Sequence, residues 1–247
     1  MKIAMCIGGL PRFIKESHSL FSKYLVGFED MDIFVHSWSE SENDNPENID
    51  LKQGTTGNSE NKTRLETVNM ISDVYKPTGY LYEPQKWDLS PNGIKAEEFV
   101  HWSMFYSICR ANEIKKQYEL ENNISYDCVI RTRFDCGLLE KLDVLEHIDK
   151  FECTVLAPWI HRHGTSDESL MDWFNFSSSE VMNTHAQVWK HMPTYKDKAV
   201  RMTSGEVLLM HHLKSNDLVF HSVAVKCKLI RLSANADTWI SYDKLPL

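Results

Sequence analysis

The stretch Tyr126-Asp-Cys-Val-Ile-Arg-Thr-Arg-Phe-Asp135 sets the expected fold. Its first half is mostly apolar and predicts a central strand over 127–133. The second half carries Arg131, Arg133 and Asp135 at alternate positions. Alternate residues of a strand point to the same side, so these three side chains are expected together on one side of the sheet.

Charges at the end of a buried strand permit two interpretations. Burying guanidinium groups and an acid is unfavourable unless they are paired or bind a charged ligand. Two cations and a carboxylate at a strand end could hold a diphosphate and its divalent metal ion. Alternatively, Arg131, Arg133 and Asp135 form an ion-pair network that only supports the sheet.

Strand and helix patterns alternate outward from this stretch over the first 160 residues. The predicted strands cover 2–7, 31–36, 79–82 and 153–157, and the predicted helices cover 13–26, 63–75 and 95–121. The alternating pattern over 223–229 predicts a half-exposed antiparallel strand. This order predicts a single α/β domain over 1–247, with a mixed, mainly parallel, Rossmann-like sheet flanked by helices and a ligand beyond the carboxyl ends of the strands.

The segment 39–61 interrupts this pattern with a long polar stretch. It holds six carboxylates and one lysine among many Asn, Ser and Gly residues. A loop of more than about 15 residues within a compact domain is a lid, a binding loop or a disordered insertion. We therefore expect a long flexible loop over 39–61.

Composition excludes several classes of protein. The 247 residues are 42% hydrophobic and 25% charged, which excludes collagen-like and wholly disordered chains. A net charge of −8 disfavours a broad electrostatic contact with nucleic acid or an anionic membrane. No apolar run approaches the roughly 18 residues of a membrane span, and the six cysteines form no Cys-x-x-Cys pair. We expect a soluble, cytoplasmic protein with reduced, buried thiols.

Polar and aromatic residues follow the first two predicted strands. Gly8 and Gly9 allow close approach of the backbone, and Arg12 stands near the start of a helix, which suits a phosphate or a nucleotide. No Gly-x-Gly-x-x-Gly or P-loop pattern is present, and a tight turn with a solvated Arg12 is the other interpretation. His36 and Trp38 could stack on a base or sugar, or they could belong to the core.

Four segments carry a resemblance to a known family. Their order is Lys2-Ile-Ala-Met-Cys-Ile-Gly-Gly-Leu-Pro-Arg-Phe13, Asp32-Ile-Phe-Val-His-Ser-Trp38, Tyr126–Asp135 and Ser204-Gly-Glu-Val-Leu-Leu209. Together they resemble small bacterial and viral glycosyltransferases with a GT-A-like fold, including those found near surface-polysaccharide genes. The likeness spans most of the chain. It implies a nucleotide-sugar-binding half over 1–137, with contacts from Gly8, Gly9, Arg12, His36, Trp38, Arg131, Arg133 and Asp135, and an acceptor-binding half over 138–247.

The resemblance also bears on a metal cofactor. The Arg-x-Arg-x-Asp segment ending at Asp135 occupies the place of the Asp-x-Asp motif that holds metal and sugar diphosphate in that family. This chain offers one carboxylate where the motif offers two. Either Asp135 ligates Mn²⁺ or Mg²⁺, or Arg131 and Arg133 neutralise the departing diphosphate without a metal ion.

Glycosyl transfer also needs a group that takes the proton of the acceptor hydroxyl when the enzyme inverts configuration. Asp172 lies among large apolar residues in Asp172-Trp-Phe-Asn-Phe176, and Glu206 begins an apolar helix. Both are candidates for the catalytic base. The structural alternatives are a helix or turn cap for Asp172 and a first-turn acid that favours the helix dipole for Glu206.

The resemblance, together with these residues, implies a glycosyltransferase of polysaccharide biosynthesis that moves a sugar from a nucleotide-diphosphate donor, such as a UDP-sugar, to a hydroxyl acceptor. One alternative is a non-catalytic module that binds a nucleotide or a glycan. Another is a viral-type transferase that glycosylates modified DNA bases. The acidic balance of the chain disfavours nucleic acid as a partner, because contacts to phosphates need lysine and arginine.

Overall fold

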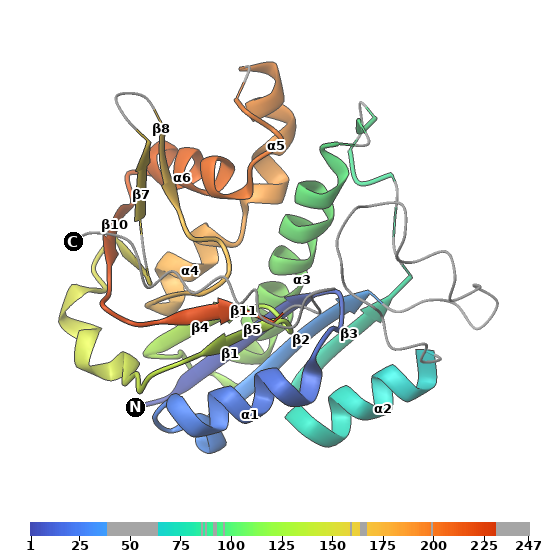
Figure 1. The fold of residues 1–247 in the computed structure, drawn as a ribbon, viewed down its shortest axis with the longest axis vertical. Helices are drawn as coiled ribbons and strands as arrows, with labels where there is room; N and C mark the ends of the chain where they lie inside the picture. The colour runs from blue at the N-terminus through green and yellow to red at the C-terminus, as the bar shows by residue number, and fades with distance from the viewer. Residues whose placement is uncertain are drawn as a thin grey trace, which may run out of the picture.

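The computed structural model describes residues 1–38, 64–84, 86, 88–90, 93–95, 97–158, 160–163, 167–198 and 200–230 (Figure 1). They form an α/β fold in which helices flank a central sheet. The loop predicted over 39–61 lies outside the described residues.

The central sheet has seven strands in the order β10-β6-β9-β4-β1-β2-β3. Only β9 runs antiparallel to its neighbours, and the other neighbouring pairs are parallel. The strands are β1 (Ile3–Gly9), β2 (Asp32–Trp38), β3 (Gly79–Glu83), β4 (Cys128–Thr132), β6 (Thr154–Ala157), β9 (Asn175–Ser177) and β10 (Val219–Ser222). The predicted mixed, mainly parallel sheet is confirmed.

Two short antiparallel pairs accompany the sheet. β5 (Cys136–Leu138) pairs with β11 (Cys227–Leu229), and β7 (Ile160–His163) pairs with β8 (Asp167–Leu170). The antiparallel strand predicted over 223–229 is therefore confirmed for its last three residues only. β10 was not predicted from the sequence, because this four-residue edge strand is mostly exposed and has no continuous apolar run.

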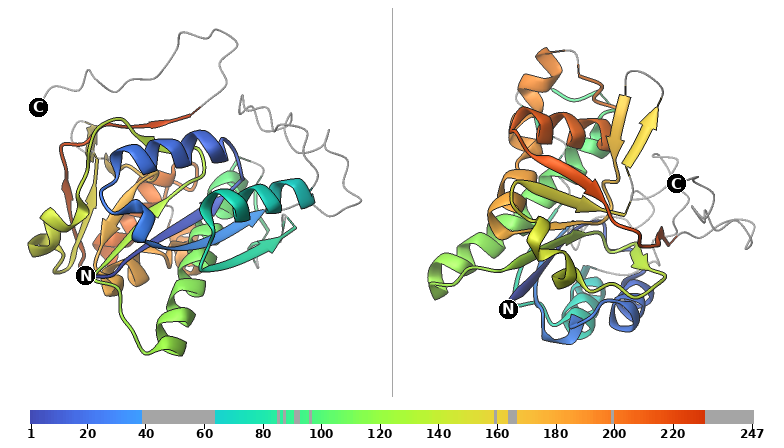
Figure 2. Two further views of the ribbon diagram at one scale, coloured as in Figure 1. Left: turned by 90° about the horizontal axis from the view of Figure 1, so that it is seen from below. Right: turned by 90° about the vertical axis from the view of Figure 1, so that its left-hand side faces the viewer.

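Helices cover both faces of the sheet (Figures 1 and 2). The helices are α1 (Ile14–Tyr24), α2 (Arg64–Tyr75), α3 (Phe99–Asn122), α4 (Ser179–His185), α5 (Val188–Asp197) and α6 (Gly205–Ser215), with 3₁₀ turns at Phe28–Asp30 and Val144–Lys150. Helix α1 connects β1 to β2, and α2 connects β2 to β3 at the edge of the sheet. Helix α3 then connects β3 to β4, which lies on the other side of β1. Since such crossovers are right-handed, the return places α3 on the opposite face from α1 and α2.

The alternation of side chains along β1 explains how the two faces pack. Ile7 joins Phe21 of α1 in the larger core, whereas Ala4 belongs to the smaller cluster on the α3 face. A Cβ atom on Gly8 would lie 3.1 Å from the backbone of Ser107 in α3. The absence of a side chain at Gly8 therefore allows α3 to pack closely on the end of β1.

The cysteines are free, and five of the six are buried as expected. Cys153 is exposed, so the expectation of buried thiols is wrong at this position. The residue lies in the turn before β6 and has a φ of 52°. Its apolar neighbours in the sequence indicated burial, but the left-handed turn places Cys153 at the surface.

Candidate active site

Predicted site residues from three parallel strands meet at one edge of the sheet. The register places Gly8 opposite His36, and Arg131 opposite Cys6 of β1 and Asn175 of β9. These positions lie toward the carboxyl ends of β1, β2 and β4. The structure thus places the residues at the edge where open α/β sheets bind ligands.

Arg131 is a buried cation without a hydrogen-bond partner among the described residues. Arg131 is 2% exposed, and none of its three guanidinium nitrogens has a hydrogen-bond partner among the described residues. Burial lowers the pKa of Arg131 to about 10, although the negative charge of Asp172 opposes this change. An uncompensated buried charge is strongly unfavourable, so Arg131 marks a position where negative charge is needed.

Arg133 and Asp135 form a bidentate ion pair with each other. Arg133 Nε and Nη2 donate to the two carboxylate oxygens of Asp135 at 2.7 and 2.9 Å. Strand β4 ends at Thr132, so the predicted alternation does not extend to these two residues. Burial by itself would lower the pKa of Arg133, but the carboxylate of Asp135 raises it. The predicted ion-pair network is therefore present for Arg133 and Asp135 but does not include Arg131. The Arg133 side chain is 24% exposed.

Asp135 is also the residue predicted to hold a metal ion. Both of its oxygens already accept hydrogen bonds from Arg133. The described part of the chain contains no group of three or more His, Cys, Asp or Glu side chains that could bind a metal ion. Because Arg133 occupies both carboxylate oxygens, Asp135 is not a free ligand in this structure, and the metal role of Asp135 stays a prediction.

Asp172 and Glu206, the two candidate bases, are neighbours in the structure. Asp172 precedes β9, and Glu206 lies in the first turn of α6. A Cβ atom on Gly205 would collide with the Asp172 carboxylate, which shows how closely that carboxylate approaches the start of α6. Ser204 caps α6 by accepting from Val207 N, and its hydroxyl donates to Glu206 Oε2 at 3.0 Å.

The environments of the two acids differ. Asp172 is 5% exposed, and its Oδ1 has no hydrogen-bond partner among the described residues. Burial, followed by the negative charge of Glu206, raises the pKa of Asp172 to about 6, while Arg131 and Arg133 oppose the change. Glu206 is only half-buried. Glu206 is therefore the more accessible of the two acids, and Asp172 is a buried carboxyl with a raised pKa.

His36 and Trp38 are part of the packed interior at the end of β2. His36 contacts Ser107 Oγ through Nδ1 at 2.7 Å and Glu83 Oε2 through Nε2 at 3.0 Å. Burial lowers the pKa of His36 to about 4, although Glu83 opposes this. The Trp38 ring is 4% exposed and stacks on Tyr106 with centroids 5.1 Å apart. Both residues therefore support the edge of the sheet from within, as the core interpretation expects.

A charged cluster surrounds Glu83, a residue that was not among those predicted from the sequence. Glu83 ends β3 and accepts from Lys86 Nζ at 2.6 Å and from the Tyr106 hydroxyl at 2.9 Å. Burial would raise the pKa of Glu83, but hydrogen bonds from Lys86, Tyr106 and His36 lower it to about 2. Its position directly after a predicted strand was the signal that could have identified it.

The two glycines at the end of β1 have different roles. Gly8 serves the contact with α3, whereas Gly9 has a φ of 123° and no atom within 4 Å of the position of a Cβ. Gly9 thus forms an open turn that another side chain would strain. Arg12 is half-buried next to this turn, where its backbone N–H donates to Leu10 O at 2.9 Å.

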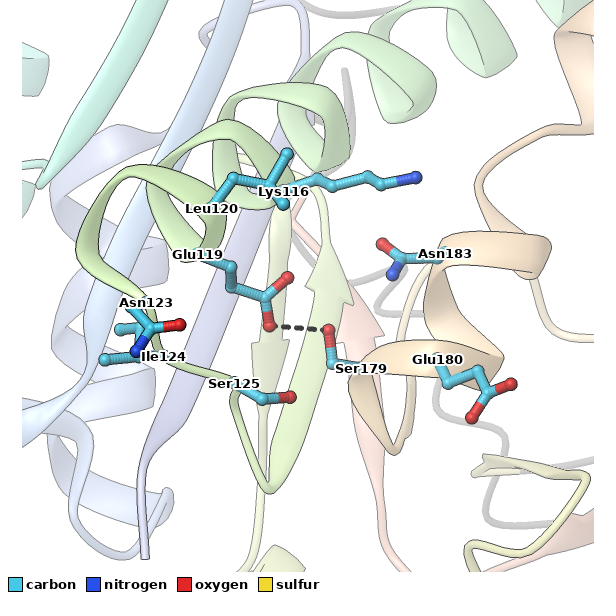
Figure 3. A pocket seen from close by; sticks show the side chains of 9 residues that line it. All are labelled: Lys116, Glu119, Leu120, Asn123, Ile124, Ser125, Ser179, Glu180 and Asn183. Carbon is cyan, nitrogen blue, oxygen red and sulfur yellow. Dashed lines mark hydrogen bonds between the residues drawn. The ribbon is translucent and has the colours of Figure 1, made fainter.

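A pocket of about 320 Å³ lies at the other edge of the sheet, between the end of α3 and the start of α4 (Figure 3). Figure 3 shows the Glu119 carboxylate facing Ser179, whose hydroxyl donates to it at 2.7 Å. The lining residues are Lys116, Glu119, Leu120, Asn123, Ile124, Ser125, Ser179, Glu180 and Asn183. No residue predicted for the site lines this pocket.

The sequence matches no protein-family model and no curated protein. In the part of the chain that the structure describes, no helix combines the length and apolar character needed to cross a membrane.

Proposed function

We propose that the protein is a GT-A-like glycosyltransferase that moves a sugar from a nucleotide-diphosphate donor to a hydroxyl acceptor. The observation that carries this proposal is Arg131, a buried guanidinium without a hydrogen-bond partner among the described residues. It lies near Asp172, which in turn neighbours Glu206. The reaction needs positive charge for a departing diphosphate and a carboxylate for the acceptor proton. The mixed sheet with one antiparallel strand supports the GT-A-like assignment.

Two arginines would stabilise the leaving diphosphate in different ways. Arg133 keeps part of its side chain exposed and can donate to phosphate oxygens, while Asp135 holds the guanidinium in position. Arg131 contributes positive charge from the interior, where the low dielectric strengthens its effect. Together the two guanidinium groups would neutralise the negative charge of the leaving diphosphate, a role that a metal ion has in other sugar transfers.

Glu206 is the better candidate for the base, because it is half-buried whereas Asp172 is almost fully buried. In a direct displacement, the acceptor oxygen forms the bond to the anomeric carbon as the bond to the diphosphate oxygen breaks. The acceptor proton passes to a carboxylate oxygen of Glu206. Asp172 would influence this step through its charge beside Glu206.

The test measures release of nucleoside diphosphate from UDP-, GDP- and CDP-sugars, with and without a saccharide acceptor. Each donor is assayed with Mn²⁺, with Mg²⁺ and with EDTA. We expect transfer from at least one donor and retained activity in EDTA. Binding of a nucleoside diphosphate without turnover of any donor would contradict the proposal and favour a non-catalytic binding module.

A matched pair of variants isolates the base. Glu206→Gln should reduce the transfer rate by at least about 100-fold, while donor affinity measured by calorimetry stays unchanged. Glu180→Gln alters another first-turn acid, exposed on α4 at the other edge of the sheet, and should leave both quantities unchanged. Equal activity of the two variants would remove Glu206 from the mechanism.

A further inference from the structure

The pocket between the end of α3 and the start of α4 has a polar inner wall whose side chains hold one another in place (Figure 3). Lys115 is fully buried behind this wall and donates to Glu119 Oε2 at 2.8 Å and to Ser179 Oγ at 2.5 Å. Burial by itself would raise the pKa of Glu119, but hydrogen bonds from Lys115 and Ser179 lower it, so the carboxylate is ionised. A wall that is ordered without a ligand loses little side-chain entropy when a ligand binds.

The same network fixes the orientation of the Asn183 amide. Its Oδ1 accepts from Lys115 Nζ at 3.0 Å and from Asn112 Nδ2 at 2.9 Å. Both partners are donors, so the oxygen faces them and the Nδ2 group faces the other way. Asn183 lines the pocket, and its Nδ2 has no acceptor among the described residues. The pocket thus contains an oriented N–H donor.

An acceptor lies beside this donor. Glu119 Oε1 accepts from Ser179 Oγ at 2.7 Å and from Tyr126 N at 3.0 Å, whereas Oε2 accepts only from Lys115 within the described part of the chain. A carboxylate oxygen has two lone pairs, so Oε2 can accept one more hydrogen bond. Glu119 Oε2 and the Asn183 amide both contact Lys115 Nζ, and they are therefore neighbours.

The remaining lining is balanced in charge and partly apolar. Lys115 and Lys116 offset Glu119 and Glu180 in formal charge, so neither an anion nor a cation gains a net attraction there. Leu120, which is 69% exposed, adds an apolar surface at the end of α3. These features call for an uncharged ligand that has an apolar face and groups that both donate and accept hydrogen bonds.

We propose that this pocket binds an uncharged saccharide, with one hydroxyl between Glu119 Oε2 and Asn183 Nδ2 and the C–H face of a ring on Leu120 and Ile124. A hydroxyl donates and accepts at once, so it satisfies the carboxylate and the amide together. The volume of about 320 Å³ lies at the lower end of the range for ligand pockets, which suits a small saccharide. The site goes beyond the proposed function, because it lies at the other edge of the sheet from the candidate active site and needs no turnover of a donor.

The test is a titration of the nitrogen-15-labelled protein with lactose, maltotriose, cellotriose and mannotriose at millimolar concentration, followed by NMR of the amide groups. We expect at least one saccharide to shift the Nδ2 signals of Asn183 and the backbone signal of Ser125, and inorganic phosphate and spermidine to leave them in place. The absence of such shifts with every saccharide would overturn the proposal, and so would larger shifts with phosphate or spermidine. The readout is binding alone, so a lack of sugar transfer would contradict the proposed function and leave this site standing.

Asn183→Asp separates binding from folding. The aspartate keeps an oxygen for Lys115 and Asn112 but replaces the N–H donor with an acceptor. We expect the affinity for the saccharide to fall by at least about 10-fold with an unchanged circular dichroism spectrum, because the ligand oxygen loses its donor. Asn69→Asp makes the same change at an exposed residue of α2 and should bind as the wild type does. Equal affinity of the two variants would overturn the proposal.

Leu120→Ala tests the apolar contact without touching the buried network. The exposed side chain contributes little to folding, and its truncation should weaken saccharide binding by about threefold or more. Val219→Ala shortens another exposed aliphatic side chain, on β10, and should leave the affinity unchanged. An unchanged affinity of Leu120→Ala would count against the site even if Asn183→Asp failed to fold.

Discussion

Replacing Asp172 by asparagine is expected to stabilise the fold at neutral pH. The carboxyl is 5% exposed and its Oδ1 has no partner among the described residues. Burial and the charge of Glu206 raise its pKa from 3.8 to about 6. The folded protein therefore has to release this proton at a higher pH than the unfolded chain does.

The magnitude follows from the separation of the two pKa values. A difference of about two pH units corresponds to about 3 kcal/mol. Between about pH 4 and pH 6 the folded chain keeps a proton that the unfolded chain has lost, so the free energy of unfolding falls as pH rises. The asparagine amide carries no charge at any of these pH values, so the advantage of Asp172→Asn should grow from about 0.5 kcal/mol at pH 4 to about 3 kcal/mol at pH 7.

Urea denaturation of the wild type and Asp172→Asn, followed by circular dichroism from pH 4 to pH 8, measures this difference. Asp149→Asn changes an exposed acid and should alter the free energy of unfolding by less than about 0.5 kcal/mol at every pH. The reasoning is refuted if Asp172→Asn is no more stable than the wild type at pH 7, or if its advantage is the same at every pH.

Three further predictions concern packing and thiol exposure. Gly205→Ala should destabilise the fold by about 1 to 3 kcal/mol in thermal denaturation, because the new methyl collides with Asp172. The same substitution in an Asp172→Ala background should have a smaller effect, and an equal effect would exclude the collision. Lys115→Met should lower the free energy of unfolding by about 3 to 5 kcal/mol, since it leaves the carboxylate of Glu119 without its buried partner at 2.8 Å; a loss below about 1 kcal/mol would contradict this. One thiol, that of Cys153, should react rapidly with a disulfide reagent in the native protein, and rapid reaction of two or more would disagree with the structure.

Local sequence patterns predicted most of the elements because they depend on neighbouring residues. The apolar run at β1 and the helical spacing of α3 need only the periodicity of one segment, and both elements are confirmed. β10 was missed, since its partner β6 and not its own composition stabilises it at the sheet edge. The end of β4 at Thr132 could not be read from the alternating charges that follow it.

The pairing of the site residues depended on the tertiary structure. The sequence placed the side chains of Arg131, Arg133 and Asp135 together on one side of the sheet. In the fold, Asp135 pairs with Arg133, whereas Arg131 is buried without a hydrogen-bond partner among the described residues. For His36 the sequence left ligand contact and a core position open, and in the fold its two ring nitrogens contact Ser107 and Glu83. The contacts of His36 join residues far apart in the chain, and local periodicity contains no information about them.

Hydrophobic periodicity and turn chemistry are properties of short segments, and they were enough to predict the α/β order of elements over the first 160 residues and the polar residues after the strands. The grouping of Asp172 and Glu206 in one site came from the packed chain alone. It rests on the close approach of α3, α6 and the loop before β9, which the missing side chain of Gly205 allows. Burial then sets the protonation of these groups, and burial exists only once the segments have packed together.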